Sequence, residues 1–337
     1  MPMNIGILGA GTWGTALAAL LARNNHKVTL WSAVGTEIDS LVNEGVHKNL
    51  KGTVLPKEII YTKSEEEVAK GKDMLLFVVA SEYMRPTAKR VAKYVEDGCI
   101  LASATKGIES GTLKTMSEII DDEMKASGRE VVYSLAAISG PTHAEEVAVG
   151  LPTSCVAAST DESIAFKIAE AFSNTCMRVY TNTDIVGVEI AGALKNIIAI
   201  AAGINRGMGF GDNSQAMLIT RGIAEMNRMG QALGCRRRTF MGLAGVGDLI
   251  VTCTSMHSRN NRCGILIGQG YTYAEAAEQI GMVVEGYYAL EAAMQLSEKY
   301  GVELPITEAV YSVIMRGMAP REAMLSLMTR ELKSELE

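Results

Sequence analysis

The chain has few of the features that mark metal-binding or nucleic-acid-binding proteins. None of its six cysteines form a C-x-x-C pair and only four histidines are present, so we expect no structural metal site. The net charge of −6 argues against a nucleic-acid partner, because such proteins are normally basic. Scattered cysteines without such spacing are typical of reduced thiols, so we expect a cytoplasmic protein.

Long apolar segments are also scarce. Residues 5–22 form one, but the first basic residue of the chain is Arg23, whereas a signal peptide would begin with basic residues. No other apolar run is long enough to span a bilayer. We therefore expect no integral membrane association.

What the first half does contain is a regular alternation of strand-like and helix-like segments. The predicted strands are 4–8, 27–31, 74–79, 99–103, 131–138, 153–158 and 177–180, with helices at 12–23 and 161–172 among them. The run 74–79 is apolar throughout, as expected for a strand buried on both faces. The alternation predicts an α/β fold with a doubly wound, mostly parallel sheet.

The pattern changes near Thr183. From Asp184 onward the sequence has a helical period, with a predicted capping box at residues 272–275 and with Pro305 and Pro320 where helices could begin. We therefore predict two domains. Residues 1–183 would form a Rossmann-like dinucleotide-binding domain, and residues 184–337 an all-α domain that completes the active site. Its many apolar helices suggest a homodimer.

The motif Gly9-Ala-Gly11-Thr-Trp-Gly14 follows the first predicted strand and opens a helix. This G-x-G-x-x-G pattern is a weak signal alone, but strand, helix and second strand within about 30 residues are the context that a dinucleotide site requires. Gly9 would permit the tight turn, Gly11 the approach of a pyrophosphate, and Gly14 close packing of helix on strand. The alternative is a purely structural turn.

The choice between NAD and NADP depends on the residues after the second strand. An NAD site expects an acid there, but Trp31 is followed by Ser32 and Ala33, and the first acid, Glu37, lies too far along the chain. No arginine marks a 2′-phosphate site. The missing acid removes a repulsive charge, so the sequence slightly favours NADP.

Two lysines are candidates for the acid–base chemistry of a ketone reduction. Lys195 interrupts a helix that is apolar nearly all round, where a cation is costly without a partner. The alternative for Lys195 is a lysine that snorkels to the domain edge. Lys106 follows the strand 99–103, where open α/β sheets bind ligands, although it could be an ordinary loop lysine.

A second polar cluster lies in the helical half. Asp248 and Thr252 are four residues apart and would share one face of a helix, although Asp248 could instead be an N-cap. Ser258, Arg259 and Asn260 follow, and arginine and asparagine near a helix start suit a phosphate or carboxylate.

With these residues in place, the chain resembles the bacterial NAD(P)-dependent sn-glycerol-3-phosphate dehydrogenases over essentially its full length. The matching stretches, in order, are Gly9–Ala16, Thr105–Gly107, Ser139–Val147, Ala193–Ile197, Gly245–Leu249, Ser258–Asn260 and Val284–Gly286. The resemblance implies the reversible reduction of dihydroxyacetone phosphate to sn-glycerol 3-phosphate, which supplies glycerophospholipid synthesis.

The resemblance also implies roles for individual residues. Lys195 would be the proton donor and acceptor, and Lys106, Asp248 and Thr252 would surround the reacting carbon. The implied substrate contacts are Lys106, Gly140, Thr142, Lys195, Asn196, Asp248, Ser258, Arg259 and Asn260. The candidate cofactor contacts are Gly9, Gly11, Thr12, Trp13, Gly14, Ser32, Lys106, Ala144, Arg259, Val283 and Glu285.

The sequence departs from the family pattern at two places. Ala80 stands where the family often has proline, and Ser32 and Ala33 stand where NADP-using members often have a basic residue. Two rival functions remain: a related two-domain dehydrogenase acting on a hydroxy acid, of the 3-hydroxyisobutyrate or ketopantoate type, and a non-catalytic dinucleotide sensor. The phosphate-type cluster at Ser258–Asn260 argues against the first, and the full set of Lys195, Asp248 and Thr252 against the second.

Overall fold

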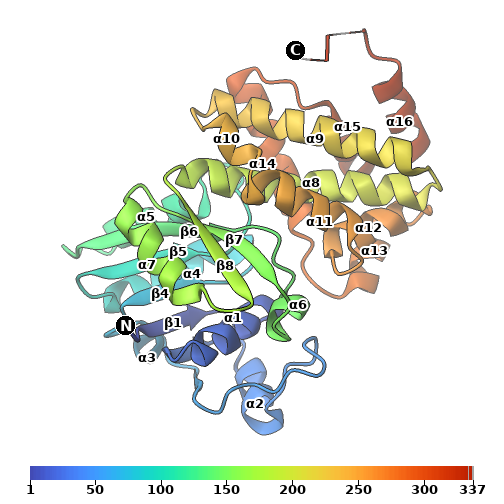
Figure 1. Cartoon of the computed structure of the whole chain (residues 1–337). Coiled ribbons are helices and arrows are strands. Elements are labelled where there is room, and N and C mark those ends of the chain that lie inside the picture. The colour runs from blue at the N-terminus through green and yellow to red at the C-terminus, as the bar shows by residue number, and fades with distance from the viewer. Residues whose placement is uncertain (333, 336–337) are drawn as a thin grey trace.

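A computed structural model describes residues 1–332 and 334–335; residue 333 and residues 336–337, the end of the predicted second domain, lie outside the described residues. The strands are β1 (Asn4–Leu8), β2 (Lys27–Trp31), β3 (Ile60–Thr62), β4 (Met74–Phe77), β5 (Cys99–Ser103), β6 (Tyr133–Ser139), β7 (Thr153–Ala158) and β8 (Met177–Asn182). They form one eight-stranded sheet in the order β3-β2-β1-β4-β5-β6-β7-β8. The predicted α/β class and mostly parallel sheet are confirmed (Figure 1).

Helices cover both faces of the sheet. They are α1 (Thr12–Arg23), α2 (Gly35–Glu44), α3 (Glu65–Ala69), α4 (Met84–Val91), α5 (Met116–Ala126), α6 (Ala144–Ala148) and α7 (Glu162–Phe172). Side chains of α1 and α7 pack on one face with Ile5 and Ile7, whereas those of α3, α4 and α5 pack on the other with Leu8 and Leu75. The sheet is therefore buried on both sides, which explains the continuous apolar run of β4.

The structure corrects the sequence prediction at several strand ends and adds one strand. β4 stops at Phe77, β6 is shifted to Tyr133–Ser139, and β8 runs on to Asn182. The short edge strand β3 was missed because three residues carry too little pattern. β7 runs antiparallel to β6, the exception in a sheet whose other pairs are parallel.

The second half is helical, as predicted. It consists of α8 (Ile185–Gly207), α9 (Asp212–Ala232), α10 (Arg237–Phe240), α11 (Asp248–Thr254), α12 (Arg259–Gly268), α13 (Tyr273–Ile280), α14 (Glu285–Tyr300), α15 (Pro305–Arg316) and α16 (Pro320–Met328), with a π-helical turn at Leu243–Gly247. The capping box at Thr272 and Glu275 is confirmed, as are the helix starts at Pro305 and Pro320.

Helix α8 is the centre of this half, and Figure 1 shows α9, α11, α12 and α14 around it. It is long and apolar enough to cross a membrane, so the expectation that no second apolar run has this length is wrong, but 89% of its 18-residue apolar window is buried in the protein. Glycines let α12 approach it closely: a Cβ on Gly264 would lie 2.1 Å from the carbonyl oxygen of Ile200. This close pairing sets the start of α12 beside the middle of α8.

Candidate active site

The glycine loop has the geometry that its sequence predicts. Gly9 has φ +119°, and a Cβ there would lie 2.5 Å from the carbonyl oxygen of Val78. A Cβ on Gly14 would lie 1.9 Å from the carbonyl oxygen of Gly9, so strand and helix are in close contact. A Cβ on Gly11 would meet no atom within 4 Å. Open space thus lies before the N-terminus of α1, where unpaired N–H groups suit a pyrophosphate.

No side chain caps α1, since its N-cap is Gly11 and its first turn, with Thr12 and Trp13, holds no acid. This leaves the positive end of the helix available for an anion. The hydroxyl of Thr12 accepts a hydrogen bond of 3.1 Å from Asn49, and Asn49 also reaches the Met282 sulfur. Sequence reasoning missed Asn49, because it lies in an irregular segment without a motif.

A second approach between the two halves involves Glu285, the first residue of α14. Its carboxylate accepts hydrogen bonds from the backbone N–H of Ser81 at 3.2 Å and from the Ser81 hydroxyl at 2.5 Å. Burial raises the pKa of Glu285, against the effects of Ser81 and of the nearby Arg259. Val283 lies two residues earlier, in the short segment before α14. The end of β4 and the start of α14 therefore form one polar contact.

Ala80 precedes this contact and stands where the family often has proline. Its backbone dihedral angles show whether a proline would fit there. Its φ of −64° and ψ of 151° are values that proline adopts. The loop after β4 therefore keeps a proline-compatible conformation without the proline.

The structure corrects one premise about the cofactor. The hydroxyl of Ser32 donates a 2.6 Å hydrogen bond to Glu37, so this carboxylate lies at the end of β2. Glu37 is therefore not too far along the chain to reach the end of β2, because the chain turns from β2 into α2 within a few residues and brings Glu37 back to Ser32. The missing acid was the basis for slightly favouring NADP, and that basis is lost.

Four residues named from the sequence come together where the two halves meet. The Nζ of Lys106 lies 2.6 Å from one oxygen of Asp248, and the Nζ of Lys195 lies 3.1 Å from the other. Lys195 also donates a 2.7 Å hydrogen bond to the hydroxyl of Thr252. Asp248 and Thr252 share one face of α11, and Thr252 in turn donates to the Asp248 backbone carbonyl at 2.6 Å.

Burial governs the ionisation of this cluster. Lys195 is only 5% exposed, so it does not snorkel to solvent. Desolvation lowers the pKa of Lys195 to about 8, and the cation of Lys106 acts in the same direction, whereas Asp248 opposes both. Burial alone would raise the pKa of Asp248, but the two lysines outweigh it and hold that pKa below its usual range. The site therefore pairs a stable carboxylate with an amine that can change its charge near neutral pH.

Two acceptors fix the position of the Lys106 amine, the Asp248 carboxylate and a backbone carbonyl oxygen. Lys106 donates a 3.1 Å hydrogen bond to the carbonyl oxygen of Gly140, and Thr142 donates to the same oxygen at 3.1 Å. Gly140 has φ +145°, and a Cβ there would lie 2.9 Å from the Cα of Cys155. Only glycine therefore fits this turn, which holds the carbonyl towards Lys106.

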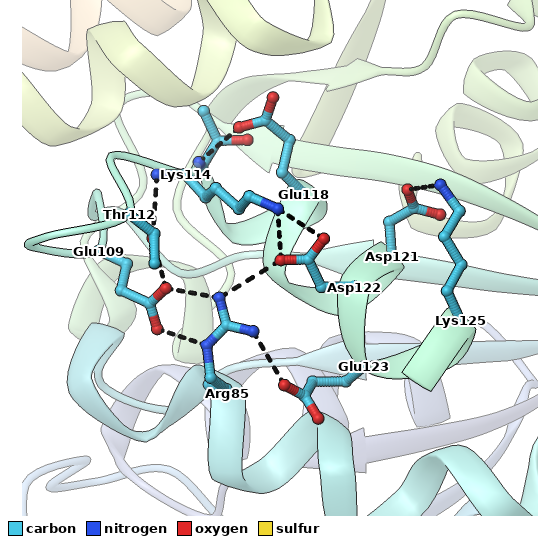
Figure 2. A network of polar contacts seen from close by, with 10 residues as sticks. Arg85, Glu109, Thr112, Lys114, Glu118, Asp121, Asp122, Glu123 and Lys125 are labelled. Atoms are coloured by element: carbon cyan, nitrogen blue, oxygen red, sulfur yellow. Dashed lines mark hydrogen bonds and ion pairs between the residues drawn. The ribbon is translucent and has the colours of Figure 1, made fainter. Parts of the chain in front are cut away.

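The loop that follows Lys106 is anchored by an ion-pair network (Figure 2). Arg85 on α4 pairs with Glu109 at 2.5 Å, and it also contacts Asp122 and Glu123 of α5 at 3.5 and 2.8 Å. Lys114 pairs with Asp122 at 2.6 Å. The sequence alone did not identify Arg85, because its partners come from two separate segments, the loop after β5 and helix α5. The network holds residues 109–114 against α4 and α5.

The cluster at the start of α12 faces α8. Asn260 donates to Asn196 at 2.9 Å and accepts from the backbone N–H of Gly286 at 2.9 Å. The hydroxyl of Ser258 caps α12 by accepting from the N–H of Asn261. Burial lowers the pKa of Arg259, so this guanidinium is a poorly solvated cation suited to an anionic ligand. The predicted neighbours Asn196, Ser258, Arg259 and Asn260 thus do come together.

His143 is a further residue that sequence reasoning did not single out. It precedes Ala144, the first residue of α6, and its ring lies 5.6 Å from that of His257, just before Ser258. Its Nε2 atom is buried and has no hydrogen-bond partner among the described residues. Burial lowers the pKa of His143, and Lys195 and Lys106 add to this effect. The imidazole is therefore neutral at pH 7 and lies in the electrostatic field of both lysines.

A doubly wound sheet with this glycine loop, joined to a helical half that buries a lysine beside a carboxylate, defines the class of dinucleotide-dependent oxidoreductases. The family model described as NAD-dependent glycerol-3-phosphate dehydrogenase N-terminus matches residues 4–165, and the C-terminus model of the same description matches residues 184–325. The chain belongs to this family.

Individual relatives agree with the family models. Glycerol-3-phosphate dehydrogenase [NAD(P)+] 2 of Lactobacillus delbrueckii subsp. bulgaricus is 51% identical over 332 residues, which cover 98% of both chains. The enzyme of the same kind from Fusobacterium nucleatum is 44% identical over 99% of both. The crystal structure of glycerol-3-phosphate dehydrogenase from Coxiella burnetii superposes with a TM-score of 0.92 at 36% identity, covering 98% of this chain and 99% of that one.

One of the two rival dehydrogenase types, the ketopantoate type, resembles this chain in fold alone. A ketopantoate reductase from Ralstonia eutropha superposes with a TM-score of 0.60 at 15% identity, covering 96% of this chain and all of that one. Such a likeness carries no information about substrate.

Proposed function

We propose that this protein catalyses the reversible, NAD(P)H-dependent reduction of dihydroxyacetone phosphate to sn-glycerol 3-phosphate. The observation that carries the proposal is the buried Lys195, which lies 3.1 Å from Asp248 and 2.7 Å from the hydroxyl of Thr252. Family membership supports the substrate, because the relatives above are named for this reaction.

The cofactor, when bound, supplies the hydride that the carbonyl carbon accepts. Lys195 gives the matching proton to the carbonyl oxygen in reduction, and its neutral amine takes that proton back in oxidation. A pKa of about 8 suits both directions near neutral pH. Asp248 stays paired with Lys106 when Lys195 loses its proton and its charge. The buried carboxylate therefore always has a cation beside it.

The proposed binding residues follow from the same arrangement. Gly9, Gly11 and Gly14 with the start of α1 would hold the pyrophosphate, where the open space at Gly11 supports the fit. The further proposed cofactor contacts are Thr12, Trp13, Ser32, Lys106, Ala144, Arg259, Val283 and Glu285. The proposed substrate contacts are Lys106, Gly140, Thr142, Lys195, Asn196, Asp248, Ser258, Arg259 and Asn260. The poorly solvated Arg259 supports a phosphate at the start of α12.

The proposal also assigns a role to each domain, a cellular location and an oligomeric state. Residues 1–183 would bind the dinucleotide and residues 184–337 would supply Lys195. The product would feed glycerophospholipid synthesis in the cytoplasm, without integral membrane association. Exposed apolar side chains on α9 and α16, such as Met217, Leu325 and Met328, support a homodimer, which light scattering after gel filtration would detect.

The test compares oxidation of NADH and NADPH in the presence of dihydroxyacetone phosphate and of unphosphorylated dihydroxyacetone. We expect fast oxidation that requires the phosphate. Oxidation of 3-hydroxyisobutyrate with NAD+ or NADP+, or reduction of ketopantoate with NADH or NADPH, would instead favour a hydroxy-acid dehydrogenase. Cofactor binding without turnover of any phosphorylated ketone would favour a sensor.

A further inference from the structure

The end of β2 carries a carboxylate in a defined position. The Ser32 hydroxyl donates to Glu37 Oε2 at 2.6 Å and accepts from the backbone N–H of Val34 at 3.1 Å. Ser32 is 5% exposed, whereas Glu37 is exposed. The Oε1 atom of Glu37 accepts no hydrogen bond from the described residues, so it is available to a ligand.

This carboxylate is adjacent to the glycine loop. The backbone N–H of Gly9 donates a 2.8 Å hydrogen bond to the carbonyl oxygen of Trp31, which ties the end of β2 to the start of the loop. In a doubly wound fold the adenosine ribose of a bound dinucleotide lies at this strand end. A carboxylate there can accept hydrogen bonds from the ribose hydroxyls, whereas it repels a 2′-phosphate.

We propose that Glu37, held by Ser32, selects NADH over NADPH by accepting a hydrogen bond from the ribose 2′-hydroxyl. The inference rests on the proposed function, because it requires a dinucleotide on the glycine loop. It assigns a cofactor preference opposite to the one that the bare sequence slightly favours.

Three basic residues near the end of β2 do not offset the charge of Glu37. Burial lowers the pKa of its neighbour His47, so that imidazole is neutral above pH 7; Glu37 opposes this shift and Lys48 adds to it. Lys63, across the strand ends, is paired with Asp39 at 2.6 Å. Arg90, whose guanidinium lies over the ring of Trp31, is in turn paired with Glu65.

The same hydrogen-bond pattern recurs one strand away, and this provides a matched control. The Thr62 hydroxyl donates to Glu67 at 2.5 Å and accepts from the backbone N–H of Ser64 at 3.0 Å, at the turn from β3 into α3. β3 lies at one edge of the sheet, next to β2, so β2 separates Thr62 from β1 and its loop. If Glu37 only stabilised the start of its helix, as Glu67 does, then replacing either residue would have the same effect on cofactor binding.

The experiment measures Kd for NADH and for NADPH by quenching of tryptophan fluorescence, with no substrate present. Trp13 and Trp31 both lie at the loop and report on binding. We expect the native chain to bind NADH more tightly. In Glu37→Gln the ratio of the two Kd values should shift towards NADPH by about tenfold or more, the effect of one charged hydrogen bond. Ser32→Ala, which frees Glu37, should shift the ratio in the same direction by less.

Glu67→Gln should leave the ratio unchanged, and thermal melting of each variant separates binding from folding. Equal or tighter binding of NADPH by the native chain would overturn the inference, as would equal shifts in Glu37→Gln and Glu67→Gln. Either result leaves the proposed reaction intact. Failure of the native chain to bind either cofactor would instead remove the proposed function.

Discussion

The Nζ of Lys106 lies 2.6 Å from Asp248, although the two residues are 142 positions apart. Lys106 follows β5 in the sheet, and Asp248 begins α11 in the helical half. Asp248 also pairs with Lys195, so one carboxylate holds two cations and joins the two halves of the protein. Any separation of the halves must break this ion pair between Lys106 and Asp248.

Lys195→Ala removes the proposed proton donor. We expect kcat for reduction of dihydroxyacetone phosphate to fall about 10²- to 10⁴-fold, the usual contribution of general acid–base catalysis. Binding of NADH, measured by fluorescence, should be retained, because the glycine loop is untouched. Lys125→Ala is the control, since Lys125 is an exposed lysine paired with Asp121 on α5. Near-normal turnover in Lys195→Ala would remove the residue from the mechanism.

The pKa of Lys195 near 8 predicts opposite pH profiles for the two directions. Below this pH the amine is protonated and can donate, so kcat for reduction should be high and should fall as pH rises through about 8. Above it the amine is neutral and can accept, so kcat for oxidation of sn-glycerol 3-phosphate should rise over the same interval. Stopped-flow rates of hydride transfer measure both, and profiles that are flat between pH 6 and 10 would contradict the assignment.

Asp248→Asn should move that inflection to lower pH. The carboxylate raises the pKa of Lys195, so its loss leaves burial and Lys106 to lower it further. Reduction at pH 8 should therefore fall more than reduction at pH 6. Asp121→Asn, which removes a partly exposed partner of Lys125, is the control and should keep the native profile. An unchanged inflection in Asp248→Asn would show that this carboxylate does not tune Lys195.

Gly264→Ala tests the close contact of α12 with α8. The added Cβ would lie 2.1 Å from the carbonyl oxygen of Ile200 and 2.9 Å from Gly203 Cα, so the helices must move apart. We expect the free energy of unfolding to fall by about 1–3 kcal/mol, as for other overpacked cores. Gly211→Ala is the comparison, because a Cβ there meets open space at an ordinary φ of −87°. Equal melting temperatures for the two variants would contradict this account.

Ala80→Pro tests the departure from the family pattern after β4. The φ of −64° at Ala80 already fits proline, so the substitution should reduce only the entropy of the unfolded chain. We expect a gain of about 0.4–1 kcal/mol in the free energy of unfolding with unchanged turnover. A loss of stability, measured by urea denaturation, would mean that the backbone after β4 needs a freedom that proline removes.

Local features of the chain could be predicted from the sequence because they depend on neighbouring residues. The alternation of apolar strands and helices predicted the sheet, Gly9 to Gly14 predicted the turn into α1, and Thr272 with Glu275 predicted a helix start. The apolar run around Lys195 predicted a buried helix, and α8 is that helix. Each of these follows from spacing within a few turns or strands.

The contacts that create the site depend on the tertiary structure. Lys106 meets Asp248 only because β5 ends where α11 begins, and Arg85 gathers carboxylates from separate segments (Figure 2). The turn after β2 brings the Glu37 carboxylate to the Ser32 hydroxyl, although the two residues are five positions apart in the sequence. Sequence spacing does not encode such distances, because they are determined by how whole elements pack. The sequence by itself therefore determined which residues can carry the chemistry, and only the tertiary structure decided which of them meet, since burial and proximity set their charges.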